Sequence, residues 1–192
     1  MSVQERKERE RAGRERLIVA TARELAEQQG WDAVTTRRLA ERIEYSQPVL
    51  YSHFRGKREI IGAVAIEGAA ELATAVRAAT AAADGPRARV MALARAYLDF
   101  AAGNPAVYDA IFELDGGLAY AQEDTPEPLK DAFAALLESL GEVAGDGVDP
   151  GLFTEVFWAS LHGLATLTRA GRLPPQYSEP RVELLVDRLA RF

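Results

Sequence analysis

The residues best suited to chemistry in this chain lie in its first third. A glutamine amide such as that of Gln47 can bond adenine at N6 and N7, and an arginine such as Arg37 can bond guanine at O6 and N7. Apolar surface of the kind that meets a thymine methyl group is offered nearby by Pro48, Val49 and Tyr51. This mixture predicts a surface that reads base pairs in the major groove of DNA.

A second set of side chains suits the phosphate backbone. Thr36 offers a hydroxyl, His53 an imidazole N–H and Lys57 an ammonium group beside a helix start. Such contacts fix the register of a protein on DNA and do not select its sequence. Taken singly, these residues have ordinary alternatives: His53 is a partly buried structural histidine, Tyr51 is a packing residue, and Gln47 or Arg37 is exposed surface.

These residues need two short helices joined by a tight turn. Leu39 and Ile43 lie four residues apart, as do Leu50 and Phe54, so each helix has one apolar stripe. Residues 44–46 between them are too few for anything but a turn, and the last of them is a serine, a good N-cap. A proline in the first turn of the second helix is tolerated there. The pattern predicts a helix-turn-helix unit.

Residues 22–61 resemble the DNA-binding domain of tetracycline-repressor-type transcriptional regulators. The resemblance lies in two runs, Thr35-Thr36-Arg37 with Leu39-Ala40, and Gln47-Pro48 with Leu50-Tyr51, His53 and Lys57. It implies base reading by Arg37 and Gln47. It also implies groove contacts by Pro48, Val49 and Tyr51, and backbone contacts by Thr36, Tyr51, His53 and Lys57.

The chain departs from the family pattern in the turn of this unit. Glu44 stands where these regulators usually have glycine. A non-glycine residue there costs about 1 kcal/mol if its φ is positive.

Composition fits a regulator with a DNA-binding head. The 192 residues carry a net charge of -6, yet residues 1–60 hold 13 Lys/Arg and 10 Asp/Glu, while the rest hold 10 and 19. The positive end is the end with the motif. The chain has no cysteine, no apolar leader and no apolar run of about 18 residues, so we expect a cytoplasmic protein.

Hydrophobic periodicity predicts an all-α fold of about nine helices, the number that the family resemblance also implies. We expect a helix-turn-helix domain over 1–60 and an effector-binding and dimerisation domain over 61–192. The predicted helices after the motif run over 57–83, 86–103, 105–114, 129–143, 152–170 and 180–192. Before them, a core helix begins at Leu17 and stops at Gly30. The charged lead, Glu5–Arg16, extends that helix or forms a flexible arm that touches DNA.

The larger domain holds enough aromatic residues to line an apolar cavity for a small-molecule effector, although each of them taken singly is more simply a core residue. The candidate ligand-binding residues are Tyr97, Phe100, Tyr108, Phe112, Phe133, Trp158 and His162. The arrangement of Trp158, His162 and Gly163 resembles a C-terminal signature found in a subset of these regulators.

The sequence pattern of the last two expected helices predicts a homodimer. Each shows an apolar stripe, and in the family this pair, here near 152–170 and 180–192, forms a four-helix interface with its mate. A twofold dimer sets two recognition helices against a palindromic operator.

We therefore expect a homodimeric repressor of transcription that a small apolar ligand releases from its operator. The alternative is an activator or regulator whose C-terminal domain binds a protein partner. We expect no enzyme, no cofactor and no metal, because the two histidines are far apart and no nucleophile, base or metal ligands converge in the sequence.

Overall fold

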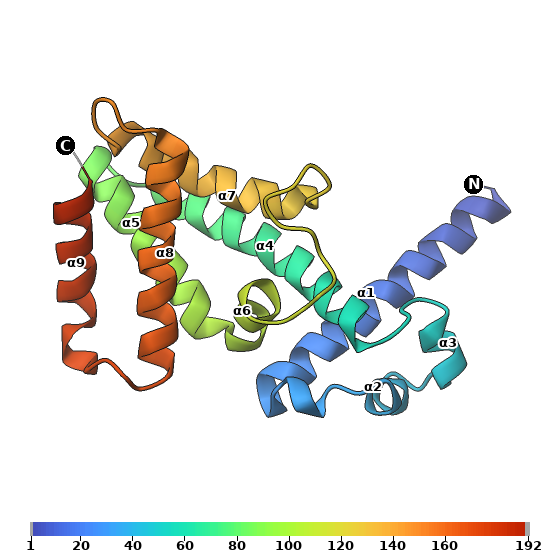
Figure 1. Cartoon of the computed structure of the whole chain (residues 1–192). Helices are drawn as coiled ribbons and strands as arrows, with labels where there is room; N and C mark the ends of the chain where they lie inside the picture. Colours follow the sequence, from blue (N-terminus) through green and yellow to red (C-terminus); the bar gives the residue numbers. More distant parts are fainter. Residues whose placement is uncertain (1, 191–192) are drawn as a thin grey trace. The chain divides into compact units, whose positions relative to one another are not determined.

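The computed structural model describes residues 2–190, and this part of the chain is helical without strands (Figure 1). The α-helices are α1 (Val3–Gln29), α2 (Thr36–Arg42), α3 (Gln47–Tyr51), α4 (Lys57–Ala81), α5 (Pro86–Gly103), α6 (Pro105–Phe112), α7 (Glu127–Leu140), α8 (Pro150–Arg169) and α9 (Ser178–Leu189). Short 3₁₀ turns lie at Trp31–Ala33, Gly141–Val143 and Pro175–Tyr177. The predicted all-α fold with about nine helices is confirmed.

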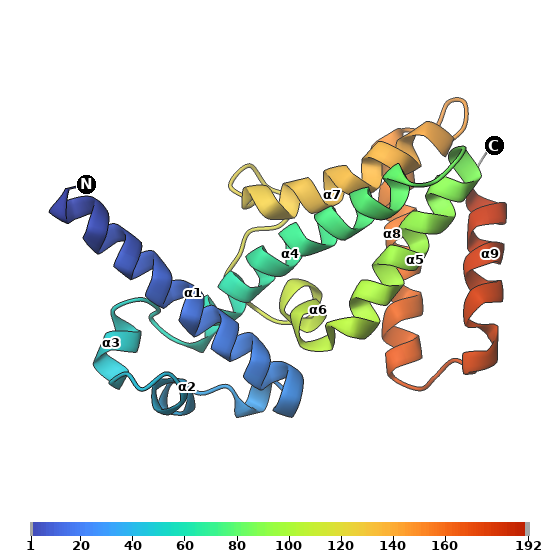
Figure 2. The ribbon, with the colours of Figure 1, turned by 180° about the vertical axis from the view of Figure 1, so that it is seen from behind.

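The helices form two compact units. The first contains the residues up to Gly68 together with Asn104–Thr125, and the second contains Ala69–Gly103 with the residues from Pro126 onward. Helix α4 contributes residues to both units, and α6 lies within the Asn104–Thr125 segment of the first. Both helices are labelled in Figure 2. The functional boundary at residue 60 stays a prediction.

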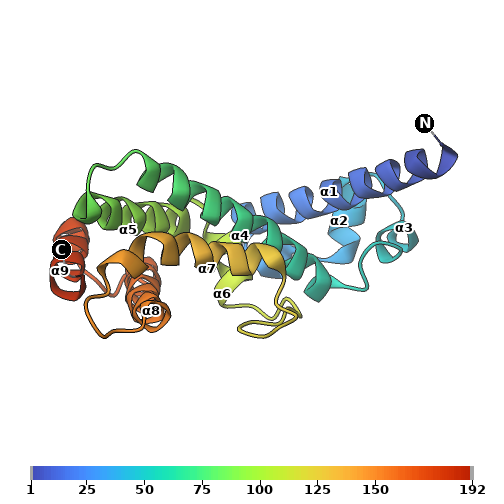
Figure 3. The ribbon, with the colours of Figure 1, turned by 90° about the horizontal axis from the view of Figure 1, so that it is seen from above.

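The charged lead is part of α1, so the helical alternative is confirmed over the flexible arm. Ser2 and Glu5 form a capping box at the helix start, in which each side chain accepts the other residue's backbone N–H. Ion pairs one turn apart follow, Arg6 with Glu10 at 3.8 Å and Arg11 with Glu15 at 3.1 Å. The first turns of α1 extend beyond α3 within the first unit (Figure 3).

Helix α6 is fixed to the end of α1 and to the 3₁₀ turn after it by polar contacts that are partly or fully buried. The Glu27 carboxylate accepts the N–H groups of Ala106 and the next residue at 3.1 and 3.2 Å, and the buried Trp31 indole donates to the Ala106 carbonyl at 2.8 Å. Asn104 occupies the N-cap position of α6 but makes no side-chain capping bond. The side-chain cap of α6 is therefore supplied by Glu27, which lies 79 residues before Ala106 in sequence.

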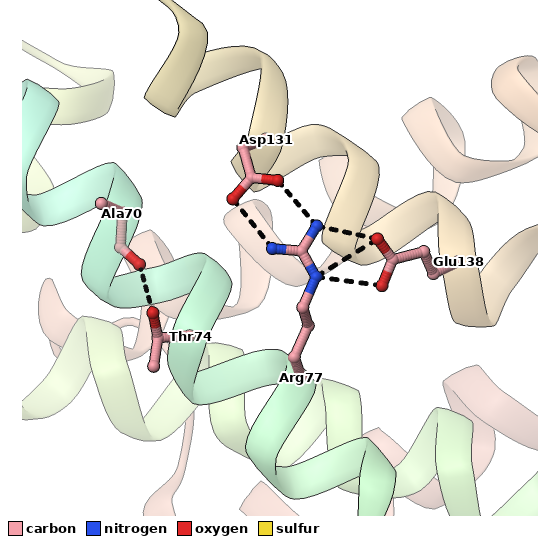
Figure 4. A network of polar contacts seen from close by, with 5 residues as sticks. All are labelled: Ala70, Thr74, Arg77, Asp131 and Glu138. Carbon is pink, nitrogen blue, oxygen red and sulfur yellow. Dashed lines mark hydrogen bonds and ion pairs between the residues drawn. The ribbon is translucent and has the colours of Figure 1, made fainter.

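The second unit packs α5, α7, α8 and α9 around buried apolar side chains such as Tyr97, Phe157 and Leu161. Across one of its surfaces, Arg77 of α4 joins two carboxylates of α7 (Figure 4). Its guanidinium donates to both oxygens of Asp131 at 2.8 Å and to Glu138 at distances down to 2.7 Å. This two-forked arrangement holds α4 and α7 together.

Candidate nucleic-acid interface

The turn between α2 and α3 has the strained geometry that its sequence suggested. Glu44 adopts φ 57°, a left-handed conformation that glycine takes without cost. The next residue, Tyr45, donates its N–H to the Ala40 carbonyl at 3.0 Å, which closes the end of α2. Ser46 takes the predicted N-cap position of α3 with extended backbone angles, but its side chain makes no capping hydrogen bond.

Helix α3 presents a face without charge. Leu50 is fully buried, whereas Gln47 and Pro48 are exposed, Val49 is half-buried and Tyr51 is 50% exposed. An ordinary solvated helix carries lysine or glutamate on such a face, because apolar and uncharged groups gain less from water. The face is therefore shaped for contact with a partner.

The structure brings α2 into the same surface. The Thr36 hydroxyl lies 3.2 Å from the Tyr51 hydroxyl, so two predicted contact residues from different helices meet. The side chain of Arg37 is 78% exposed and bonds Glu41 one turn later at 2.9 Å, a bond that raises the Arg37 pKa. Because this pair is open to solvent, the guanidinium can exchange Glu41 for a base edge at small cost.

His53 lies inside the first unit. Only 4% of its side chain is exposed, and Nδ1 lies 3.2 Å from a carboxylate oxygen of Glu15 in α1. That hydrogen bond is the main cause that holds the pKa of Glu15 below its ordinary value, with a smaller contribution from Arg11. The contact ties α1 to the end of the helix-turn-helix unit formed by α2 and α3, which we call the recognition unit. In this structure His53 bonds Glu15, and its predicted contact with a DNA phosphate stays a prediction.

Lys57 also has a partner within the chain. Its ammonium donates to the Trp31 carbonyl at 2.5 Å, which ties the start of α4 to the 3₁₀ turn after α1. This acceptor offsets the unfavourable position of a cation at a helix start. The α4 start is also held by Glu59, whose carboxylate accepts the Arg55 N–H at 2.8 Å.

The loop after α6 packs on the start of α4. Sequence reasoning missed this contact. Arg58 bonds Asp115 at 2.9 Å, and the pKa of Asp115 is lowered chiefly by that bond. The backbones of Gly62 and Gly116 approach so closely that a Cβ on Gly62 would lie 2.4 Å from the Gly116 carbonyl oxygen. The sequence signal for this contact is the pair of glycines that follows Asp115.

The predicted ligand residues are divided between the two units. Tyr97 and Phe100 on α5 are buried, and the indole of Trp158 on α8 donates to the Tyr97 hydroxyl at 3.0 Å. Tyr108 and Phe112 lie on α6 in the first unit, with ring centroids 4.7 Å apart. Phe133 on α7 and His162 on α8 are half-buried in the second unit.

The last two helices expose large apolar side chains. On α8 three such side chains lie on one helix face, four and then eleven residues apart, and one further leucine lies on α9. They are Leu152 (57% exposed), Val156 (51%), Leu167 (44%) and Leu184 (58%). On α8 the same face includes Ala159 and Gly163. We call these six residues the α8–α9 apolar face.

Within residues 2–190, no three His, Cys, Asp or Glu side chains gather in a way that could hold a metal ion. In the same part of the chain, every helix is too short or too polar to cross a membrane.

Comparison with known proteins agrees with this architecture. Residues 18–64 match the family model for bacterial regulatory proteins of the tetR family, and residues 90–191 match the model for the tetracyclin repressor-like C-terminal domain. The first match covers the whole helix-turn-helix unit. The second covers most of the chain beyond α4. Family members are transcriptional regulators, which confirms the expectation that this protein is not an enzyme.

Curated relatives match over part of the chain. The HTH-type transcriptional regulator YobS of Bacillus subtilis (strain 168) is 32% identical over 96 residues, half of each chain. The tetracycline repressor protein class C of Escherichia coli is 48% identical over 48 residues, 25% of this chain and 22% of that protein. The chain thus spans half or less of the length of these relatives.

Among solved structures, a protein from Rhodococcus sp. RHA1 has a similar fold over almost its full length. The TM-score is 0.74 with 26% sequence identity, over 92% of this chain and 95% of that one. Both family models, the relatives and the geometry of the head lead to one conclusion. The chain belongs to the tetR family of transcriptional regulators and carries a helix-turn-helix DNA-binding domain.

Proposed function

We propose that the protein is a homodimeric repressor that binds a palindromic operator and leaves it when a small apolar ligand binds the larger domain. The observation that carries the proposal is the exposed, uncharged face of α3 beside Arg37. Gln47 at the start of this face has the amide that pairs with adenine, and Pro48 and Tyr51 suit thymine methyl groups. The backbone contacts that we propose, by Thr36, His53 and Lys57, fix the register.

The α8–α9 apolar face supports the dimer. Leu152, Val156, Leu167 and Leu184 are each more than 40% exposed, whereas such side chains are ordinarily buried. A second copy of the same face would cover them by twofold symmetry. Two heads joined in this way can read two half-sites, which one head of this size cannot do.

Release by a ligand would use α4. This helix starts at Lys57 beside the recognition unit and continues without a break to Ala81 in the second unit. A ligand that favours one position of α4 would change the separation of the two recognition helices. To switch strongly it must prefer the state free of DNA by several kcal/mol, because equal affinity for both states moves nothing.

The aromatic residues supply candidate ligand contacts. In the second unit, Trp158 and Tyr97 are joined by a hydrogen bond. The relative named as a tetracycline repressor matches this chain over 48 residues, a quarter of its length, so it supports repression without indicating the ligand. The C-terminal signature at Trp158, His162 and Gly163 also stays a prediction.

Footprinting of genomic DNA with the full chain tests the proposal. We expect a few palindromic protected sites that disappear when an effector is added. An activator that binds a protein partner, our alternative, would keep its sites in the presence of small apolar compounds and would raise transcription from them. Absence of any protected palindrome would contradict both.

A further inference from the structure

The first turns of α1 lie outside the buried core. Residues 4–11 are exposed throughout, and the first buried core residue of the helix is Ile18. Of the 12 residues from Glu5 to Arg16, six are basic and four are acidic. Such a segment gains little from burial, so its persistence as a helix rests on its capping box, its ion pairs and its continuity with the core.

This extension leaves the core in a fixed direction beside the recognition unit. Ile18 is fully buried, and Glu15 one turn earlier bonds the buried His53, which follows α3 by two residues. Beyond this anchor, the extension continues past α3 in both views of the first unit (Figures 1 and 3). From Ile18 to Lys7 it is about 16 Å long, at 1.5 Å per residue.

The basic side chains of this extension differ in whether a carboxylate of the same helix pairs with them. Arg6 and Arg11 are paired with Glu10 and Glu15, so they offer little net charge. Lys7 and Arg14 are exposed and lie seven residues apart on the helix face that leads into Ile18.

No acidic side chain in residues 2–190 pairs with Lys7 or Arg14. Two turns of helix separate them, about 10 Å. Arg9 and Arg16 have the same spacing on the opposite face.

We propose that the α1 extension is a second DNA-contact surface, in which Lys7 and Arg14 bind phosphates that flank the bases read by α3. This inference rests on operator binding by the helix-turn-helix unit and adds a rigid, sequence-independent contact to it. The extension works as a preformed helix, so its ordering costs nothing on binding. Each neutralised phosphate releases counterions and makes binding more salt-dependent.

The test compares two double variants of the full chain, Lys7→Gln with Arg14→Gln and Arg9→Gln with Arg16→Gln. Both remove two positive charges at the same spacing, and glutamine keeps a similar helix propensity. Operator affinity is measured by fluorescence anisotropy from 50 to 200 mM salt, with hydroxyl-radical footprints of the same complexes. Circular dichroism checks that both variants keep their helix content.

We expect the first variant to lower the slope of log affinity against log salt by about 2 per bound chain. Over this fourfold salt range the fall in affinity would then be about tenfold smaller for each bound chain, or about 100-fold smaller for a dimer on its operator. The footprint should shorten at its flanks while the central protection remains. The second variant should keep the wild-type slope and footprint.

Equal slopes for wild type and first variant, or equal losses in both variants, would overturn the inference while operator binding stands. Failure of the wild type to bind any palindromic DNA would instead overturn the proposed function, and this inference with it.

Discussion

Two exposed surfaces of this molecule depart from the usual charged cover of a soluble helix, and they do so in opposite ways. The α3 face offers hydrogen-bonding and small apolar groups, with Arg37 beside it. The α8–α9 apolar face offers leucine and valine side chains that are about half exposed. The first suits a polar partner with a fixed pattern of donors and acceptors, and the second suits an apolar copy of itself. The side chains that replace the usual charged ones on each surface therefore indicate which kind of partner it binds.

The largest effect is expected from charges placed on the apolar face. Val156→Glu together with Leu184→Glu should weaken self-association at least about 100-fold, because each carboxylate would be buried without a partner. Size-exclusion chromatography with light scattering should show a dimer for the wild type and a monomer for the variant.

Val148→Glu serves as the control for this pair. Val148 is 45% exposed but precedes α8, so its variant should remain dimeric. A wild type that is monomeric at micromolar concentration would refute the proposed dimer.

A smaller effect is expected on the α3 face. Gln47→Ala and Arg37→Ala should each weaken operator binding by about 1 to 3 kcal/mol and relax the choice of base at one position. Lys57→Ala should instead weaken binding to all sequences alike. Gel shifts on a panel of single-base operator variants separate these outcomes.

The matched control for Arg37 is Arg172→Ala, which removes an exposed arginine of the second unit whose side chain makes no hydrogen bond or ion pair within residues 2–190. Its operator affinity should be that of the wild type. Unchanged affinity in the Gln47 and Arg37 variants as well would contradict the assignment of the reading face.

Sequence patterns predicted the helices well because their signals are local. Proline at the start and glycine at the end set α5 to 86–103 as expected. The predicted start of α9 at Pro180 was two residues late, since the helix begins at Ser178. A proline fits at more than one position of the first turn, because the first N–H groups of a helix need no partner within it. Its place in the sequence therefore does not fix the first residue of the helix.

The contacts that position the recognition unit could not be predicted in this way. The bond between His53 and Glu15 spans 38 residues, and the cap that Glu27 gives α6 spans 79. The approach of Gly62 and Gly116 depends on the path of a loop. Periodicity says which face of a helix is buried, but not which distant side chain covers it.

At the turn beside the reading face, strain and charge can be separated. Glu44→Gly should raise the free energy of unfolding by up to about 1 kcal/mol, because glycine adopts φ 57° without strain. Glu44→Gln removes only the charge, so its free energy of unfolding should be that of the wild type. Urea denaturation of both variants measures the difference. A gain in the glutamine variant equal to that in the glycine variant would show that charge, not backbone strain, is the cause.

The smallest effect is expected where exposed charges already have partners within the chain. Hydrogen bonds from Arg77 are the main cause that lowers the pKa of Asp131 and of Glu138 below their ordinary values of 3.8 and 4.5. A lowered pKa in the folded state stabilises the protein above the ordinary value, and this stabilisation is lost as pH falls through the folded value. The wild type should therefore have a higher Tm than Arg77→Met at pH 7, by a few degrees at most because both carboxylates are about half exposed.

That gap in Tm should close as the pH is lowered from about 5 to 3, where the carboxylates become protonated. Calorimetric scans across this range measure it, with Arg172→Met as a control whose Tm should follow that of the wild type at every pH. Operator affinity at pH 7 should be unchanged in Arg77→Met, because this arginine is satisfied by α7 and needs no external partner. A gap that persists at pH 3 would show that Arg77 stabilises the unit through the packing of its side chain and not through its ion pairs.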